Sequence, residues 1–271
     1  MTRHNNIIIL ALQLGKCRFV NFSRCFNLFK QCRKETGIIN KPIVIFACKV
    51  LQDAIEQHLP EGFVNHASYL DYGLHRHPKK MTLSLQEEID DITTPSTIIL
   101  GYGLCGGGLA GLRAGEHTLI VPRTDDCIAI LFGSRKVYLD EFGKHPGTYY
   151  LSKGWLECGS HPLKEYHEYL QRYGQEDVDW IMDQQYSHYK RLVLVAHTEE
   201  ELKNYRPQAY EVARYCQYWE MKYEEMLGSQ DYVKNVLNNA KTLHDGDEDF
   251  LVIPPGDVIR EAQFRNLTWW E

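Results

Sequence analysis

Short apolar runs alternate with longer amphipathic segments along most of the chain. Compact runs rich in β-branched residues are typical of buried strands, and they occur at 41–47, 63–70, 96–103, 116–123, 190–197 and 250–259. Segments with apolar residues three or four positions apart are typical of amphipathic helices, and they occur at 49–58, 81–92, 125–135, about 162–190 and about 199–240. This alternation predicts an α/β fold: a mostly parallel, Rossmann-like sheet with helices on both faces, and long helices in the C-terminal half.

The charge pattern divides the chain near residue 40. The first forty residues hold seven lysines and arginines and one acid, which leaves 23 basic and 35 acidic residues, a net charge of −12, in the remainder. We therefore expect residues 1–40 to be a basic extension outside the fold, and residues 41–271 to form a single α/β domain. Signal-peptide and organelle-presequence interpretations of the extension stay open, although no small-residue cleavage site follows its apolar run.

Composition excludes several classes of function. A formal net charge of −6 over 271 residues gives no electrostatic support for a nucleic-acid partner. No apolar run reaches the roughly 18–20 residues needed to cross a bilayer, so we expect no membrane partner. The cysteines of the acidic body are widely spaced, which is not the pattern of a secreted disulfide scaffold. We therefore expect a cytoplasmic protein.

Three cysteines stand where a predicted strand meets a predicted helix. Cys48, Cys105 and Cys127 each follow a predicted strand and open a helical segment. The carboxyl ends of parallel strands share one edge of a sheet, where open α/β folds bind ligands. We therefore expect the three sulfurs to meet around one centre. Cys158 and Cys216 lack this placement and are expected to lie apart from it.

Three thiolates at one sheet edge repel each other unless a cation neutralises them. A helix start also lowers the pKa of a thiol, which favours the ligating form. Three cysteine ligands with one open position suit a [4Fe–4S] cluster, our first expectation, or a zinc ion, the second. The alternative without a ligand is that each cysteine is a small buried residue behind a strand.

A glycine-rich loop follows the third predicted strand and surrounds Cys105. Gly101, Gly103 and Gly106 match the dinucleotide pattern G-x-G-x-x-G, and Gly107 extends the run. A nicotinamide or flavin site is one interpretation, although the pattern normally belongs to the first strand–helix unit and the segment after this loop is too short for its helix. The other is a flexible collar that lets the backbone approach a bulky group held by the cysteine. In both interpretations the four glycines are candidate cofactor-binding residues.

Candidate catalytic residues lie close to the same junctions. Asp71 and His75 follow the second predicted strand, where the histidine is a fourth ligand, an acid or base, or an ordinary surface residue. Arg123 has the chemistry to clamp a substrate carboxylate or phosphate. Asp125 and Asp126 precede a predicted helix, and Asp125 is expected to cap it.

Five motifs together resemble the domain-of-unknown-function family 1638. They are FAC near the first strand, D-x-G-L-H, YGLCGGGLAGL, P-R-x-D-D-C and P-G-T-Y-Y-L-x-x-G-W, over roughly residues 42–255. The last of these motifs has two interpretations, a lid or an aromatic packing loop. The resemblance implies that these residues occupy family motif positions: Cys48, His75, Cys105, Arg123, Asp125, Asp126 and Cys127. The chain departs from the family at Gly107, where a polar residue such as asparagine is expected.

The resemblance implies no established reaction, but it implies a setting. Family members resemble proteins of anaerobic bacteria and archaea that are often encoded beside corrinoid-dependent methyltransferases. We therefore expect a metal- or iron–sulfur-binding protein in or near one-carbon methyl transfer, with a small-molecule substrate or a corrinoid protein or methyltransferase as partner. One alternative is a non-catalytic accessory or metal-delivery protein, and a further one is a dinucleotide-binding oxidoreductase. Whether the protein is an enzyme stays open.

Overall fold

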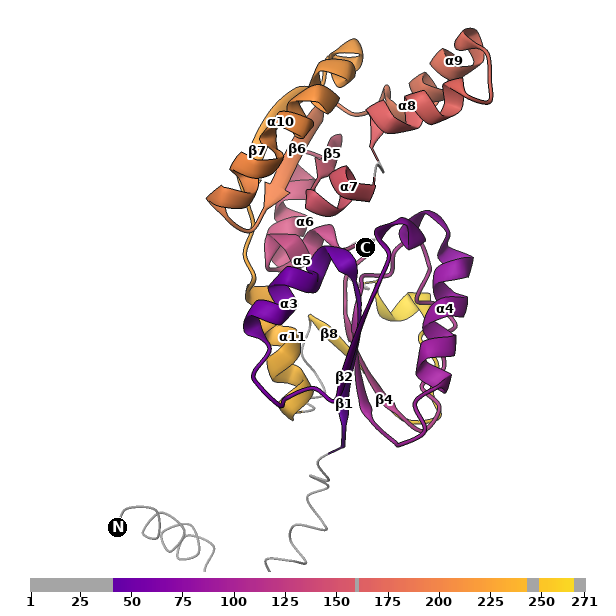
Figure 1. Ribbon diagram of the computed structural model, residues 1–271, viewed down its shortest axis with the longest axis vertical. Helices are drawn as coiled ribbons and strands as arrows, with labels where there is room; N and C mark the ends of the chain where they lie inside the picture. Colours follow the sequence, from indigo (N-terminus) through magenta and orange to yellow (C-terminus); the bar gives the residue numbers. More distant parts are fainter. Residues whose placement is uncertain (1–40, 159–160, 243–248, 266–271) are drawn as a thin grey trace, which may run out of the picture. The chain divides into compact units, whose positions relative to one another are not determined.

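A computed structural model describes residues 41–158, 161–242 and 249–265 (Figure 1). The basic extension predicted at 1–40 lies outside these ranges, and Pro42–Glu271 form one compact unit by their internal contacts. The strands are β1 (Ile43–Cys48), β2 (His66–Leu70), β3 (Thr97–Gly101), β4 (Thr118–Pro122), β5 (Thr148–Leu151), β6 (Arg191–Ala196), β7 (Lys222–Leu227) and β8 (Phe250–Ile253). The α-helices are α3 (Gln52–His58), α4 (Pro78–Asp90), α5 (Ile128–Phe132), α6 (Arg135–Lys144), α7 (Lys153–Cys158), α8 (Pro162–Leu170), α9 (Gln175–Tyr186), α10 (Glu199–Cys216) and α11 (Asp231–Thr242). Short 3₁₀ turns include η1 (Lys49–Leu51) and η2 (Tyr72–Arg76).

The first sheet has the strand order β2-β1-β3-β4-β8. The first four of these strands are parallel to their neighbours, and β8 runs antiparallel to β4. Every residue of β3 and β4 is buried, as expected for central parallel strands. Because β2 and β3 lie on opposite sides of β1, the order reverses between β1 and β3. Open α/β sheets bind their ligands at the carboxyl ends of the strands at such a switch point.

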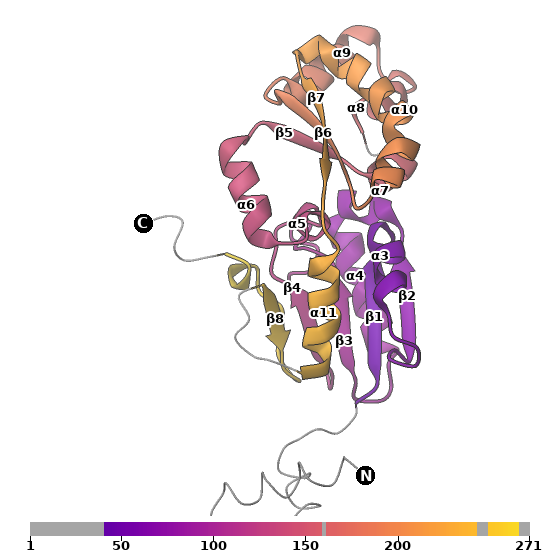
Figure 2. The same cartoon turned by 90° about the vertical axis from the view of Figure 1, so that its left-hand side faces the viewer.

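Helices cover both faces of the first sheet (Figures 1 and 2). Successive strand residues point to opposite faces, so each of these strands contributes to two cores. Ile45 and Ile99 pack with residues of α3, α5 and α11 on one face. Phe46 and Leu100 pack with the buried side of α4 on the other. The expected α/β fold, mostly parallel and covered on both faces, is therefore confirmed.

A second sheet, which the sequence did not predict, has the parallel strand order β5-β6-β7. It lies in sequence between α5 and α11, so the chain leaves the first sheet after β4 and returns to it at β8. Leu192 and Leu194 of β6 pack with α9 and α10. Val193 and Val195 belong to the same core as β1 and α3. The two sheets therefore share a hydrophobic core.

The expected strands are confirmed as β1, β2, β3, β4, β6 and β8, but β5 and β7 were missed. β5 lies in the stretch that allowed a lid or a packing loop, and β7 lies inside the segment predicted as helix at 199–240. The sequence of β7, KYEEML, is half charged because it is an edge strand. Its acids pair with arginines of neighbouring elements: Glu224 with Arg191, and Glu225 with Arg206. Such a strand has no apolar alternation to reveal it.

Candidate functional site

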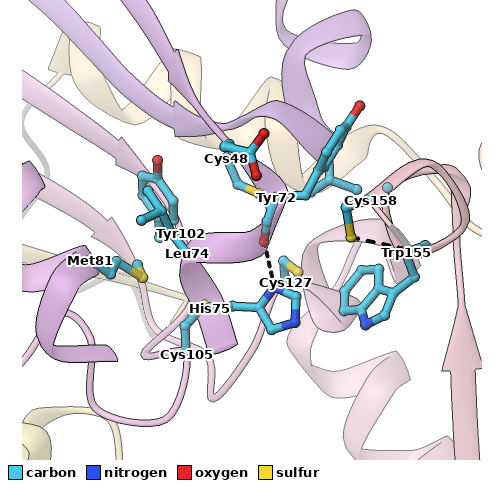
Figure 3. Close-up of a pocket in the computed structure, with 13 residues that line it drawn as sticks. Cys48, Tyr72, Leu74, His75, Met81, Tyr102, Cys105, Cys127, Trp155 and Cys158 are labelled. Carbon is cyan, nitrogen blue, oxygen red and sulfur yellow. Dashed lines mark hydrogen bonds between the residues drawn. The ribbon is translucent and has the colours of Figure 1, made fainter. Parts of the chain in front are cut away.

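One cavity lies at the carboxyl ends of the strands of the first sheet, at the switch point between β1 and β3 (Figure 3). Its volume is about 20 Å³, and about 10–15 Å³ is enough for one ordered water molecule. Its lining includes four cysteines, one carboxylate and one imidazole, together with tyrosine, tryptophan, leucine and methionine side chains. The cavity therefore concentrates soft and ionisable donors in a small, mostly apolar space.

Three of the four cysteines lie at or after the carboxyl ends of three adjacent strands of the first sheet. Cys48 is the last residue of β1, Cys105 follows β3 after a short loop, and Cys127 directly precedes α5. The parallel register of β1, β3 and β4 carries these strand ends to the same edge. The structure thus brings the three thiols to one cavity, as the sequence predicts.

Burial dominates the ionisation of these thiols. It raises the pKa of Cys48 to about 11. It also raises the pKa values of Cys105 and Cys127, and each is raised further by the negative charge of neighbouring groups, Cys48 among them. The expectation that helix starts lower these pKa values is therefore wrong, because desolvation of a thiolate outweighs a helix dipole here. At neutral pH and without a cation, the three thiols are protonated.

Cys105 also differs from the prediction in its backbone. Residues 105–111 form turns, so this cysteine does not begin a helix. Its φ of +49° is left-handed, which is uncommon for a residue with a Cβ and costs about 1–2 kcal/mol. Two bonds to the loop after β4 hold it there: Leu104 N donates to Thr124 O, and Cys105 N to Asp125 O, each at 2.8 Å. A glycine would adopt this backbone conformation without strain. The strain at this position is therefore the energetic cost of having the Cys105 side chain there.

The glycines of this loop have packing and backbone roles. A Cβ at Gly101 would lie 2.5 Å from a Cβ of β1, and one at Gly103 would lie 2.6 Å from the backbone carbonyl carbon of Asp126. Gly106 and Gly107 have φ values of +65° and +93°, which glycine adopts without strain. Within the described ranges no helix begins at this loop. It therefore lacks the helix N-terminus on which a dinucleotide pyrophosphate is bound.

Cys158 lines the same cavity, contrary to the expectation that it lies apart. It is the last residue of α7, which follows the first strand of the second sheet. Gly154 permits the close approach of this helix, because a Cβ there would lie 2.7 Å from Val50 Cγ2 and 3.0 Å from Tyr72 Cδ1. Sequence reasoning missed this cysteine since no local pattern places α7 against the first sheet.

The remaining cysteine of the described chain is remote, as predicted. Cys216 is fully buried in the core of the second sheet, among residues of β6 and α10. It is not among the residues that line the cavity. This residue therefore provides a matched control for substitutions at the cavity.

Asp71 and His75 both line the cavity. His75 Nδ1 lies 2.6 Å from the backbone oxygen of Tyr72, which only accepts, so Nδ1 donates and the lone pair of the neutral ring is on Nε2. Burial lowers the pKa of His75, which favours this neutral form, and its ring lies 5.6 Å from that of Trp155. Asp71 Oδ1 accepts a hydrogen bond from Gly73 N at 2.8 Å, which orders the start of η2.

The other three candidate catalytic residues do not line the cavity. The N-cap of α5 is Cys127, not the expected Asp125. The carboxylate next to this helix start is that of Asp126, whose Oδ1 accepts from Ile128 N at 2.8 Å. Burial raises the pKa of Asp126 to about 6, and its charge raises the pKa of the nearby Cys105 thiol. Asp125 is exposed, and its backbone oxygen holds the glycine loop. Arg123 also lies outside the cavity, so the structure offers it no role as a clamp for a ligand there.

The donor set suits a soft metal ion, but its side chains are not arranged around one. Among the residues that the structure describes, no group of three or more histidine, cysteine, aspartate or glutamate side chains is placed to hold an ion. Four thiols around one small cavity are nevertheless the ligand type that zinc and iron–sulfur clusters take. Protonated thiols gain nothing from converging, so ligation requires them to lose protons and turn inward.

These features define an α/β protein with a cysteine-lined cavity at its sheet switch point. The family model described as "Protein of unknown function (DUF1638)" matches residues 69–237, more than half of the chain, and the chain belongs to this family. The matched range includes His75, Cys105, Cys127 and Cys158. No curated protein and no solved structure matches the chain. Within the described ranges, no helix is both long and apolar enough to cross a membrane.

Proposed function

We propose that the protein binds a metal through Cys48, Cys105 and Cys127 and presents a further coordination position to a ligand or substrate. The observation that carries this proposal is the convergence of three thiols, from the ends of β1, β3 and β4, on one cavity at the switch point. Ligands of open α/β sheets bind at this place. The thiols come from separate segments of the chain, which is also how metal sites assemble their ligands.

The alternative without metal, in which the cysteines are small packing residues, accounts for burial but not for strain. Neutral, buried thiols with raised pKa values fit both interpretations. The left-handed backbone of Cys105 does not fit the packing interpretation, because a glycine would occupy this position with less strain. A ligand role explains why a side chain occupies this position.

The donor set bears on which metal binds. Zinc and iron–sulfur clusters both take thiolate ligands. Metal analysis therefore separates a zinc ion from the [4Fe–4S] cluster expected from the sequence.

The cavity also provides a group to move protons. When bound, a metal with an open position supplies a Lewis acid that activates a coordinated ligand. His75 is the residue of this chain that we assign as proton acceptor, because its neutral ring carries the lone pair on Nε2 and it lines the same cavity.

The biological setting in this proposal rests on the family resemblance. On that basis we propose that the protein acts in the cytoplasm, in or near corrinoid-dependent methyl transfer, with a small-molecule substrate or a corrinoid protein or methyltransferase as partner. Incubating the metal-loaded protein with a corrinoid protein and a methyl donor tests this setting, and transfer of label between them is the expected result. Absence of transfer with every donor would remove the enzymatic form of the proposal.

A second candidate, a non-catalytic accessory protein, is favoured by exposed aromatic side chains. Trp180 on α9 and Tyr218 after α10 are 66% and 68% exposed, and Tyr210 on α10 is 50% exposed. Large exposed aromatic residues are enriched at protein interfaces. Co-purification with a methyltransferase component, lost on Trp180→Ala, together with no turnover, would favour this candidate.

Metal analysis tests the site directly. Protein purified without oxygen should contain near-stoichiometric zinc or iron, and inorganic sulfide accompanies iron only in a cluster. Cys105→Ala should lose the metal, whereas Cys216→Ala, a buried cysteine elsewhere, should keep it. Wild-type protein with neither metal, or Cys105→Ala with full metal content, would contradict the proposal.

A further inference from the structure

We propose that a basic groove beside the glycine loop binds the phosphate group of a small molecule. The groove has a volume of about 670 Å³, and small-molecule sites measure roughly 300–1,000 Å³. Two segments line it: the stretch from the end of η2 into the first turns of α4, and the glycine loop after β3. The inference depends on this groove and not on the proposed metal.

The groove concentrates positive charge in a chain that is acidic as a whole. The formal net charge of the chain is −6. The lining nevertheless includes four basic side chains, and it includes no aspartate or glutamate among the described residues: Arg76, His77, Lys79 and Lys80. All four residues are exposed. The groove therefore presents several cationic donors to the solvent without an acid between them.

The acids outside the groove neutralise only part of this charge. Arg76 lies 3.6 Å from a carboxylate oxygen of Glu165 and 4.0 Å from one of Glu168, and ion pairs of this length near the surface contribute little. Within the described ranges no ion pair joins Lys79 or Lys80 to an acid. These lysines lie in the first turn of α4, which holds no acid and where the helix dipole disfavours cations. A bound anion would offset both the dipole and the repulsion between the lysines.

The two walls of the groove are fixed to each other. The Thr82 hydroxyl lies 3.0 Å from Pro78 O in its own helix and 2.9 Å from Gly108 O in the glycine loop. A Cβ at Gly106 would lie 3.4 Å from Pro78 Cγ, and one at Gly108 would lie 2.8 Å from Met81 Sδ. The helix and the loop are therefore in close contact, and the groove exists before a ligand binds, which lowers the entropy cost of binding.

The chemistry of the lining favours a phosphate group over other anions. Lysine binds phosphate as a point charge, and arginine donates from a planar fork to its oxygens. A phosphate has more negative charge and more oxygen acceptors than a carboxylate, so it engages more of these donors at once. The opposite wall leaves room for its oxygens, because a Cβ at Gly107 would meet nothing within 4 Å.

Two observations favour a small molecule over a nucleic acid. The acidic remainder of the chain repels a long polyanion, which needs an extended basic surface rather than one groove. The groove also adjoins the cysteine cavity, since His75 and Cys105 line the cavity while the next residues of both segments, Arg76 and Gly106, line the groove. A small molecule anchored by its phosphate would therefore lie beside the loop that carries Cys105.

Calorimetric titration of the full chain with inorganic pyrophosphate tests this inference. The wild type should bind one pyrophosphate with a dissociation constant below about 1 mM, and acetate should bind more weakly. Lys79→Gln/Lys80→Gln removes two cations from the groove and keeps good helix formers, so its affinity should fall at least about tenfold. Lys136→Gln/Lys144→Gln is the matched control. It removes the same charge from exposed positions of α6, outside the groove, and it should keep the wild-type affinity.

The remaining outcomes separate this groove from the proposed metal and from general charge effects. Wild-type protein that binds neither pyrophosphate nor inorganic phosphate overturns the inference, and so does an equal affinity in the two double variants. Loss of pyrophosphate binding after treatment with a chelator would assign the anion to a metal and would also overturn it. Unchanged metal content in Lys79→Gln/Lys80→Gln, together with lost pyrophosphate binding, supports the groove as a separate site. Binding of an oligonucleotide but not of pyrophosphate would overturn the small-molecule ligand.

Discussion

Replacing Gly103 with alanine should destabilise the protein by pushing apart the two loops that position Cys105 and Cys127. The added Cβ would lie 2.6 Å, 2.7 Å and 2.8 Å from three backbone atoms of Asp126. Ordinary contacts of this kind are 3.4–4 Å. All three atoms are main chain, so no side-chain rotation relieves the overlap. The loop after β3 must move by about 1 Å relative to the loop after β4.

The size of the effect follows from what that shift breaks. The bonds from Leu104 N to Thr124 O and from Cys105 N to Asp125 O are each 2.8 Å, and an extra ångström takes them beyond hydrogen-bond range. Each contributes about 1 kcal/mol, and overpacking adds about 1–3 kcal/mol. The lower entropy of the unfolded alanine chain offsets up to about 1 kcal/mol. The expected net loss in the free energy of unfolding is about 2–5 kcal/mol.

Urea unfolding followed by tryptophan fluorescence and circular dichroism measures this loss. Gly143→Ala is the matched control, because this glycine lies inside α6 with open space around it, and alanine there should stabilise the protein by up to about 1 kcal/mol. Gly103→Ala should also bind Zn²⁺ more weakly, since it displaces Cys105. A Gly103→Ala protein with the urea midpoint of the wild type would refute the close-contact argument. If Gly103→Ala lost nucleotide binding while its stability stayed unchanged, the result would instead support the dinucleotide interpretation of this glycine.

Further predictions concern ionisation and the approach of α7. Burial raises the pKa of Asp126 from 3.8 to about 6, so the folded state binds this proton more tightly than the unfolded chain and the free energy of unfolding falls as pH rises from about 4 to about 6. The full pKa shift corresponds to about 3 kcal/mol in the free energy of unfolding, and solvent screening of this half-buried carboxylate makes the effect smaller. In Asp126→Asn, the urea midpoint should change less with pH across this range. Burial raises the pKa of Cys48 to about 11. In metal-free protein, iodoacetamide should therefore alkylate this thiol about tenfold faster for each pH unit from 8 toward 11. If peptide mapping shows that Cys48 reacts at pH 8 as fast as the free amino acid cysteine, its burial is contradicted. The three first-sheet thiols are protonated at pH 7, so Zn²⁺ binding should release close to three protons, as calorimetry in buffers of different ionisation enthalpy measures. Release of fewer than one proton would contradict the ligand set. Gly154→Ala should push α7 away from Val50 and Tyr72 and lower the urea midpoint, whereas Gly143→Ala should not lower it.

Much of the first sheet and of its cysteine edge was predictable from the sequence, because the signals are local. β1, β3 and β4 are continuous apolar runs, and a buried parallel strand requires such a run in its own residues. Strands of this kind that alternate with helices align their carboxyl ends at one edge. The placement of Cys48, Cys105 and Cys127 then follows from their positions just after these strands.

The second sheet and its contribution to the cavity depended on contacts between distant segments. β7 is recognised by its pairing with β6 and by ion pairs such as Arg206–Glu225, not by a pattern of its own. Cys158 enters the site because α7 packs against Val50 and Tyr72, residues roughly 80 to 110 positions earlier in the chain. No window of sequence around Cys158 contains that information.

The ionisation of the cysteine thiols likewise depended on tertiary structure more than on local sequence. The sequence indicated low thiol pKa values, since a helix start stabilises a thiolate and helix starts are visible in local patterns. The structure reverses this for Cys48 and Cys127, because the desolvation that raises a thiol pKa depends on how completely the rest of the fold covers the group. The sequence by itself determined which residues end the strands. Only the tertiary structure decided what surrounds them, because burial is a property of the packed molecule and not of any segment.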